Sequence, residues 1–92
     1  MSIHTYVVTD QLISRKPCKL LSVTITNTGS NEGEVIVYDS RSAVGADKVA
    51  TLMVGSKETE QYGWKGLELS KGLYIDVNDK VDMVTVEWEF VD

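Results

Sequence analysis

The C-terminal segment from Asp82 to Val91 alternates between apolar and polar residues with a period of two. Because successive side chains of a β-strand point to opposite faces, one face carries the apolar set and the other the polar set. The apolar set is Val84, Val86, Trp88 and Phe90, and the polar set is Thr85, Glu87 and Glu89. This pattern predicts a half-buried strand with its apolar face toward a core. The expected core contacts are Val23, Ile25, Leu73 and Ile75.

The same period recurs along the chain, without a helical period. About eight short extended segments result, separated by glycine and asparagine turns. They cover residues 3–8, 18–27, 34–39, 48–54, 57–62, 67–69, 72–77 and 82–91. The chain is therefore predicted to be all-β: a single small antiparallel β-sandwich over residues 1–92, of the jelly-roll or Greek-key type. Residues 1–17 form an N-terminal strand and a connection that could pack on a neighbouring chain.

Several local features refine this prediction. Asp10 to Lys16 is polar and ends at Pro17, so it is expected to be a connection. In the segment from Cys18 to Asn27, alternation places Leu21, Val23 and Ile25 inward and Ser22, Thr24 and Thr26 outward. The polar segment from Lys57 to Tyr62 suits an edge strand, and Gly63 to Gly66 is expected to interrupt it. Asn78-Asp79 suits a tight turn before the last strand.

Size and charge restrict the possible partners. A 92-residue domain with one cysteine has a small core and no internal disulfide, so oligomerisation or docking on a larger assembly is expected to stabilise it. The net charge is −5 and the nine Lys and Arg residues are dispersed, which argues against nucleic acid. No apolar run approaches the roughly 20 residues that cross a bilayer, and the first residues lack a signal-peptide pattern. The sequence predicts a soluble product made in the cytoplasm, with no membrane partner.

The residue types needed for catalysis are scarce. His4 is the only histidine and Cys18 the only cysteine, so neither a nucleophile–imidazole pair nor a structural zinc site is expected. A glycosidase pair could come only from scattered strand glutamates, which are more typical of a solvated face. The best metal candidate is the acidic run Asp76, Asn78, Asp79 and Asp82, which favours a solvated turn over a calcium site. We expect no enzyme activity, no cofactor and no metal.

Three aromatic residues are candidates for an interface. Tyr62 and Trp64 flank Gly63 in a polar segment, where they could cap the open end of the sandwich, contact a partner or stack on a sugar ring. The segment from Val35 to Tyr38 is apolar on both faces, although a two-layer sandwich has one interior. Another chain, a neighbouring loop or a larger assembly must then cover one face, which makes Tyr38 a candidate contact. The loop from Ser40 to Ala46 could be a flexible tip or a docking loop.

Several of these segments resemble a known family. The run from Ser22 to Gly29 is a strand that ends in an Asn-Thr turn, and Val35 to Ser40 is an apolar strand that ends in Tyr-Asp. Together with Gly66 to Leu69 and Gly72 to Ile75, they resemble small β-sandwich virion proteins of tailed bacteriophages. The resemblance covers roughly Cys18 to Phe90 and is poorest at residues 57–60.

The resemblance implies a virion structural protein without catalytic residues. The leading expectation is a capsid decoration (cement) protein that binds the major capsid protein on the outside of the head as a trimer. A tail or head-completion component is the alternative within the same class. From a different class, a carbohydrate-binding module for host attachment could use Tyr62 and Trp64.

Overall fold

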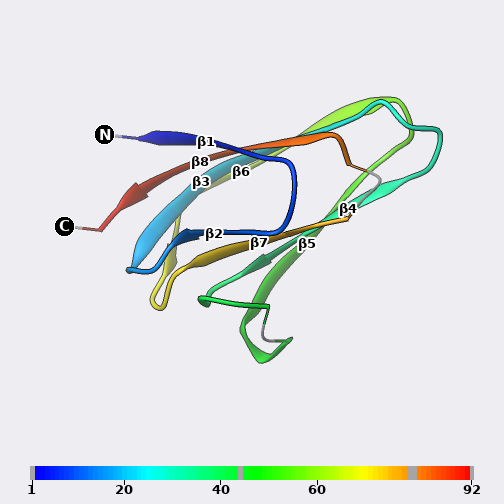
Figure 1. Ribbon diagram of the computed structural model, residues 1–92. Coiled ribbons are helices and arrows are strands. Elements are labelled where there is room, and N and C mark those ends of the chain that lie inside the picture. Colours follow the sequence, from blue (N-terminus) through cyan, green and yellow to red (C-terminus); the bar gives the residue numbers. More distant parts are fainter. Residues whose placement is uncertain (1, 44, 79–80, 92) are drawn as a thin grey trace.

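The computed structural model describes residues 2–43, 45–78 and 81–91, which form eight strands and one short 3-10 turn (Figure 1). The strands are β1 (Ile3–Val7), β2 (Gln11–Ser14), β3 (Cys18–Asn27), β4 (Gly33–Tyr38), β5 (Lys48–Val54), β6 (Glu58–Leu69), β7 (Leu73–Val77) and β8 (Met83–Phe90). The 3-10 turn, η1 (Gly45–Asp47), precedes β5. The predicted all-β fold is confirmed. No helix among the described residues is long and apolar enough to cross a membrane.

Two four-stranded antiparallel sheets form the sandwich. Their strand orders are β1-β8-β3-β6 and β2-β7-β4-β5. The pairs β1–β8, β2–β7, β3–β6 and β4–β5 are nested, as if one long hairpin had been rolled up so that successive pairs fall in alternate sheets. This connectivity is the jelly roll, one of the two alternatives that the sequence allowed. The strands run along the long dimension of a body of 41 × 27 × 18 Å, so the turns collect at its two ends (Figure 1).

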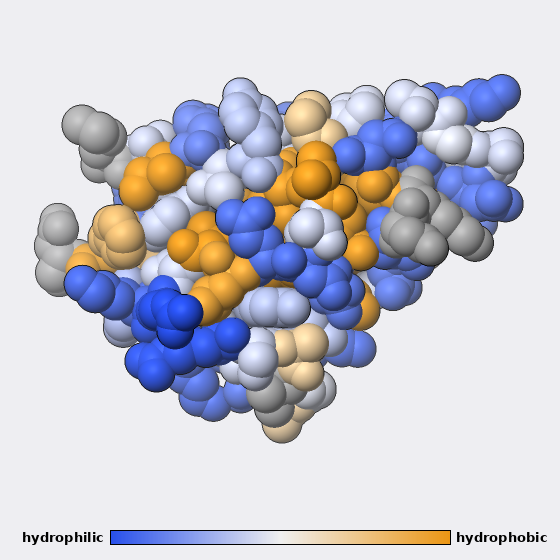
Figure 2. All heavy atoms as spheres, viewed as in Figure 1, coloured by the Kyte–Doolittle hydropathy of each residue, from blue (hydrophilic) through white to orange (hydrophobic). Residues whose placement is uncertain are grey.

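The core lies between the sheets and contains most of the predicted residues. The fully or nearly fully buried side chains include Val23, Ile25, Leu73, Ile75, Val84, Val86 and Trp88. The indole N–H of Trp88 donates a hydrogen bond to Thr5 Oγ1 at 3.0 Å, which satisfies its polar group. Figure 2 shows hydrophobic residues gathered along the middle of the molecule, between hydrophilic borders.

The prediction that Phe90 is buried with this set is wrong. Its ring packs edge-to-face on the ring of Trp88, with the two ring centroids 4.8 Å apart, so Phe90 lies on the predicted face. However, Phe90 is 51% exposed. Phe90 is the last residue of β8, and open depressions border it, lined by Ile13, Lys16, Pro17 and Val91 among other residues. Alternation decides which way a side chain points, but the opposite layer decides whether it is covered.

The predicted inward position of Leu21 is also wrong. The pairing of β3 shifts between Leu20 and Ser22 on both of its neighbours, β6 and β8. Cys18 and Leu20 are buried before this shift and Val23 and Ile25 after it, whereas Leu21 is only half-buried. A β-bulge inserts one residue and so reverses the alternation of the strand. Each half of β3 keeps a strict period of two, but with opposite phase, so the predicted inward positions fit only the second half.

Two expected boundaries differ as well. The predicted connection at residues 10–16 contains β2, which pairs with β7 from Gln11 to Ser14. The expected interruption at residues 63–66 lies inside β6, which runs unbroken to Leu69 and forms the edge of its sheet as predicted. Gly66 has a φ of +85°, so the strand absorbs its irregularity at a glycine instead of ending there. Of the expected Asn78-Asp79 turn, Asp79 lies outside the described residues.

Candidate functional site

An apolar row crosses the outer face of the sheet β2-β7-β4-β5. Leu12 pairs with Tyr74, and Tyr74 pairs with Tyr38, so their side chains share one face. The neighbouring side chains Leu73, Ile75 and Val37 point into the core, which places this row outside. On β5 the register partner of Tyr38 is Lys48, and Val49 lies next to Lys48 where the β4–β5 pairing shifts. We call Leu12, Tyr38, Val49 and Tyr74 the apolar row. No third layer of the described chain covers this sheet.

The members of the apolar row differ in how much surface they present. Tyr38 is only 6% exposed. Its ring packs edge-to-face on the ring of Tyr74, and the two ring centroids are 6.1 Å apart. Leu12 and Tyr74 are half-buried, and Val49 is 37% exposed. Burial, followed by the charges of Asp10 and Asp76, raises the pKa of Tyr74, so its phenol is uncharged at neutral pH. The four side chains of the row are therefore uncharged, Lys48 lies at its β5 edge, and Tyr38 mainly supports its neighbours.

Carboxylates border the apolar row on one side. Asp76 is the partner of Ile36 in the next row of the same face, and Asp10 accepts a hydrogen bond from the Val77 backbone N–H at 2.8 Å. Burial raises the pKa of Asp76, and a hydrogen bond with Asp10 and the charges of Asp10 and Glu34 raise it further. Negative charge is thus concentrated where the outer face approaches the β1–β2 and β7–β8 connections.

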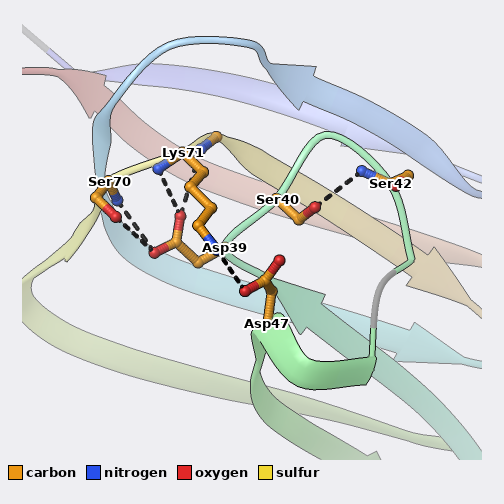
Figure 3. Close-up of polar contacts among 7 residues, drawn as sticks. Asp39, Ser40, Ser42, Asp47, Ser70 and Lys71 are labelled. Carbon is orange, nitrogen blue, oxygen red and sulfur yellow. Dashed lines mark hydrogen bonds and ion pairs between the residues drawn. The ribbon is translucent and has the colours of Figure 1, made fainter.

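The opposite end of the sandwich is organised by Asp39. Its carboxylate accepts hydrogen bonds from the backbone N–H groups of Lys71 (2.8 Å), Ser70 (3.1 Å) and Gly72 (3.3 Å), and from Ser70 Oγ (3.3 Å) (Figure 3). Burial alone would raise the pKa of Asp39, but these donors lower it below its usual value. Asp39 therefore ties the β4–β5 loop to the β6–β7 turn. Lys71 Nζ contacts Asp47 at 2.7 Å, which raises the pKa of Lys71.

The β2–β3 turn joins the same end. Arg41 Nε donates a hydrogen bond to the Arg15 carbonyl at 3.2 Å. A Cβ on Gly72 would lie 2.6 Å from the Ser14 carbonyl oxygen and 3.0 Å from that of Ser40, so only glycine lets the three segments approach this closely. A depression of about 420 Å³ lies above them, lined by Pro17, Ser40, Arg41, Ser70 and Lys71. We call the turns that carry Arg15, Lys16, Arg41 and Lys71 the basic end.

Sequence reasoning did not find the basic end. Its four cations are distributed over residues 15–71 and look dispersed along the chain. They meet because the β2–β3, β4–β5 and β6–β7 connections of a jelly roll all fall at one end. The signal that could have found it is the occurrence of basic residues in alternate connections.

The structure separates the predicted aromatic residues. Tyr62 and Trp64 are half-buried and pack against the core from β6, and the Tyr62 hydroxyl donates to the Met53 carbonyl across the β5–β6 edge. Both rings are therefore partly covered by the core, along the edge strand β6 and not at an open end of the sandwich. Tyr38 lies in the other sheet. A role of these three residues in an interface stays a prediction.

The candidate catalytic and metal residues do not converge. Cys18 is buried in the core, where burial raises the pKa of its thiol, whereas His4 is exposed and lies 3.6 Å from Glu87. Asp82 binds the backbone N–H and the hydroxyl of Thr28, which lowers its pKa, while Asp76 interacts with Asp10. Among the described residues, no group of three His, Cys, Asp or Glu side chains could hold a metal ion.

Comparison with family models, curated protein sequences and solved structures gave no match. The fold and its surfaces therefore define the class: a small eight-stranded jelly-roll sandwich with an uncovered apolar sheet face and a basic end.

Proposed function

We propose that this protein is a non-enzymatic virion structural protein of a tailed bacteriophage, a capsid decoration protein that binds the outside of the head. The resemblance in the sequence suggests this class, and the jelly-roll topology agrees with it because this fold recurs in viral capsid domains. Because the same architecture serves unrelated functions, including lectins, the proposal rests on the surface of this chain.

The observation that carries the proposal is the apolar row. A sheet face that is exposed to water normally alternates toward polar residues, as the outer face of the other sheet does with His4, Thr24, Thr85 and Glu87, where Tyr6 is the exposed exception. The outer face of β2-β7-β4-β5 instead presents Leu12, Tyr74 and Val49, with Ile36 and Met53 beside them. An uncovered strip of this kind suits a flat partner surface. We propose that the apolar row contacts the major capsid protein.

The aromatic residues favour this role over host attachment through sugars. Carbohydrate stacking needs an exposed ring face, and Tyr62 and Trp64 both pack on the core. The edge-to-face contact of Tyr38 with Tyr74 fixes the apolar row before binding, so little side-chain freedom would be lost on docking. No observation among the described residues specifically favours a sugar ligand.

The test is binding to heads of the encoding phage that lack this protein. Co-sedimentation with purified heads should saturate and should raise the temperature at which the heads rupture. Val49→Glu should weaken binding about tenfold or more, because it places a carboxylate in an apolar contact. Gln61→Glu adds the same charge on β6 of the other sheet and should bind like the parent. Failure of the parent protein to bind heads would overturn the proposal, as would equal binding by Val49→Glu.

A further inference from the structure

The charges of the described residues are sorted between the two ends of the sandwich, although the chain is acidic overall. The basic end carries Arg15, Lys16, Arg41 and Lys71. The carboxylates of these turns are Asp39, which accepts four hydrogen bonds and stays charged, and Asp47, which pairs with Lys71. One residue inside the adjoining strands lie Glu68 and Glu89, both of which are register partners of Lys19. Cations therefore outnumber carboxylates in the described turns of this end, although the protein has a net charge of −5.

The other end collects the β1–β2, β3–β4, β5–β6 and β7–β8 connections and carries the opposite charge. Its described carboxylates are Asp10, Glu32, Glu34, Glu58, Asp76 and Asp82, and Lys57 is the one described cation among these connections. We call it the acidic end. Thr28 and Asp82 link the β3–β4 turn to the start of β8, and Lys57 N–H donates to the Gly29 carbonyl at 3.0 Å. Like the basic end, this end is held together by contacts between its connections.

Apolar side chains are exposed at both ends. Phe90 and Val91 border the depressions at the basic end, which are also lined by Arg15, Lys16 and Pro17, and none of the described lining residues is acidic. At the acidic end Val8 is 66% exposed, and two strand residues near this end are also exposed: Met83, the first residue of β8, and Met53, the next-to-last residue of β5. Each end thus combines apolar surface with charge, and the two signs are complementary.

We propose that this protein self-associates head to tail, with the basic end of one copy docked on the acidic end of the next. A contact between different ends of identical chains is heterologous, so it gives a closed ring or an open filament. The contact leaves the apolar row of every copy free, and it does not depend on the proposed role on phage heads.

The size of the ends sets the strength of this contact. A cross-section of 27 × 18 Å offers roughly 500 Å² per copy, or about 1,000 Å² for both surfaces. This lies below the roughly 1,200–2,000 Å² of stable interfaces, so the contact is weak and depends on concentration. Because charge complementarity drives it, raising the salt concentration should weaken it further.

The test is sedimentation velocity of the whole chain from about 10 μM to 1 mM, at about 20 and 500 mM NaCl, a range that spans weak affinities and strong screening. The parent protein should form larger species as its concentration rises, mainly at low salt. Lys16→Glu damages the basic end and Glu32→Lys the acidic end, and each should weaken association about tenfold or more. Lys65→Glu makes the same charge change on the exposed edge of β6 and should associate like the parent.

Mixing the two damaged variants gives the decisive result. Lys16→Glu retains an intact acidic end and Glu32→Lys an intact basic end, so an equimolar mixture should form dimers but nothing larger. A parent protein that stays monomeric at every concentration and salt would overturn the inference, and so would a mixture that sediments as two separate monomers. A monomer that still binds heads through Val49 would refute head-to-tail association while leaving the decoration role intact.

Discussion

Among single residues, Trp88 joins three interactions in one side chain. It is nearly fully buried, it contacts Phe90 edge-to-face, and it donates a hydrogen bond to Thr5. Trp88→Ala should lower the free energy of unfolding by about 3–5 kcal/mol, a large part of the stability of a small domain. Urea denaturation measures this. Phe90→Ala is the matched control: its ring is half exposed, so it should cost only about 1–2 kcal/mol. A Trp88→Ala protein as stable as the parent would contradict the core assignment.

Two aspartates should respond to pH with opposite signs. Backbone donors lower the folded-state pKa of Asp39, so its charged form stabilises the fold above its unfolded-state pKa, and this contribution is lost as pH falls through the folded-state pKa. Burial and Asp10 raise the folded-state pKa of Asp76, so its charged form destabilises the fold at neutral pH. That destabilisation is relieved as pH falls through the raised pKa.

The corresponding amide variants separate these effects. At about pH 7, Asp39→Asn should melt at a lower temperature than the parent and Asp76→Asn at a higher one. As the pH falls, the Asp76→Asn difference should shrink first, because the folded-state pKa of Asp76 is raised, whereas the Asp39→Asn difference should persist to lower pH, because the folded-state pKa of Asp39 is lowered. Thermal melts at a series of pH values measure both variants, and Glu32→Gln, in an exposed turn, is the control. If both variants changed the melting temperature in the same direction, the opposite pKa shifts of Asp39 and Asp76 would be refuted.

At the scale of single elements, β6 continues through the shift in its pairing with β3 because Gly66 can adopt the backbone conformation needed there. Gly66 has a φ of +85°, and a Cβ there would find room, 3.6 Å from the nearest atom of Lys19. Gly66→Ala should therefore cost about 1–2 kcal/mol through backbone strain alone. Gly63→Ala, three residues earlier in β6, has the nearest atom at 3.9 Å and no such φ, so it should be nearly neutral. Equal unfolding free energies for the two variants would contradict the claim that Gly66 needs a positive φ.

The strands also show how far alternation predicts structure. In β8 and β7 the apolar residues at every second position are buried as expected, apart from Phe90. In β3 the bulge reverses the inward face after Leu20, because two neighbouring strands impose their own register on it. The β2 segment has a short, mixed pattern, and it becomes a strand because β7 offers it hydrogen bonds.

At the scale of the whole molecule, the nested pairing predicts slow folding. β1 pairs with β8, so Ile3 must meet Trp88 from nearly the opposite end of the chain. Closing such distant contacts costs chain entropy before any stabilising contact forms, and sandwiches of this kind fold in milliseconds to seconds. Stopped-flow fluorescence of a Trp64→Phe variant would follow Trp88 alone. Complete folding within microseconds would contradict the nested topology.

By itself the sequence determined the all-β class, the approximate number of strands and the inward face of most of them, because alternation is a local consequence of strand geometry. It also showed that the β4 segment is apolar on both sides. The tertiary structure decided the jelly-roll order, the burial of Tyr38, the half-exposed position of Phe90 and the meeting of four cations at the basic end. Each of these depends on which segments become neighbours in space, and that is set by the pairing of distant strands.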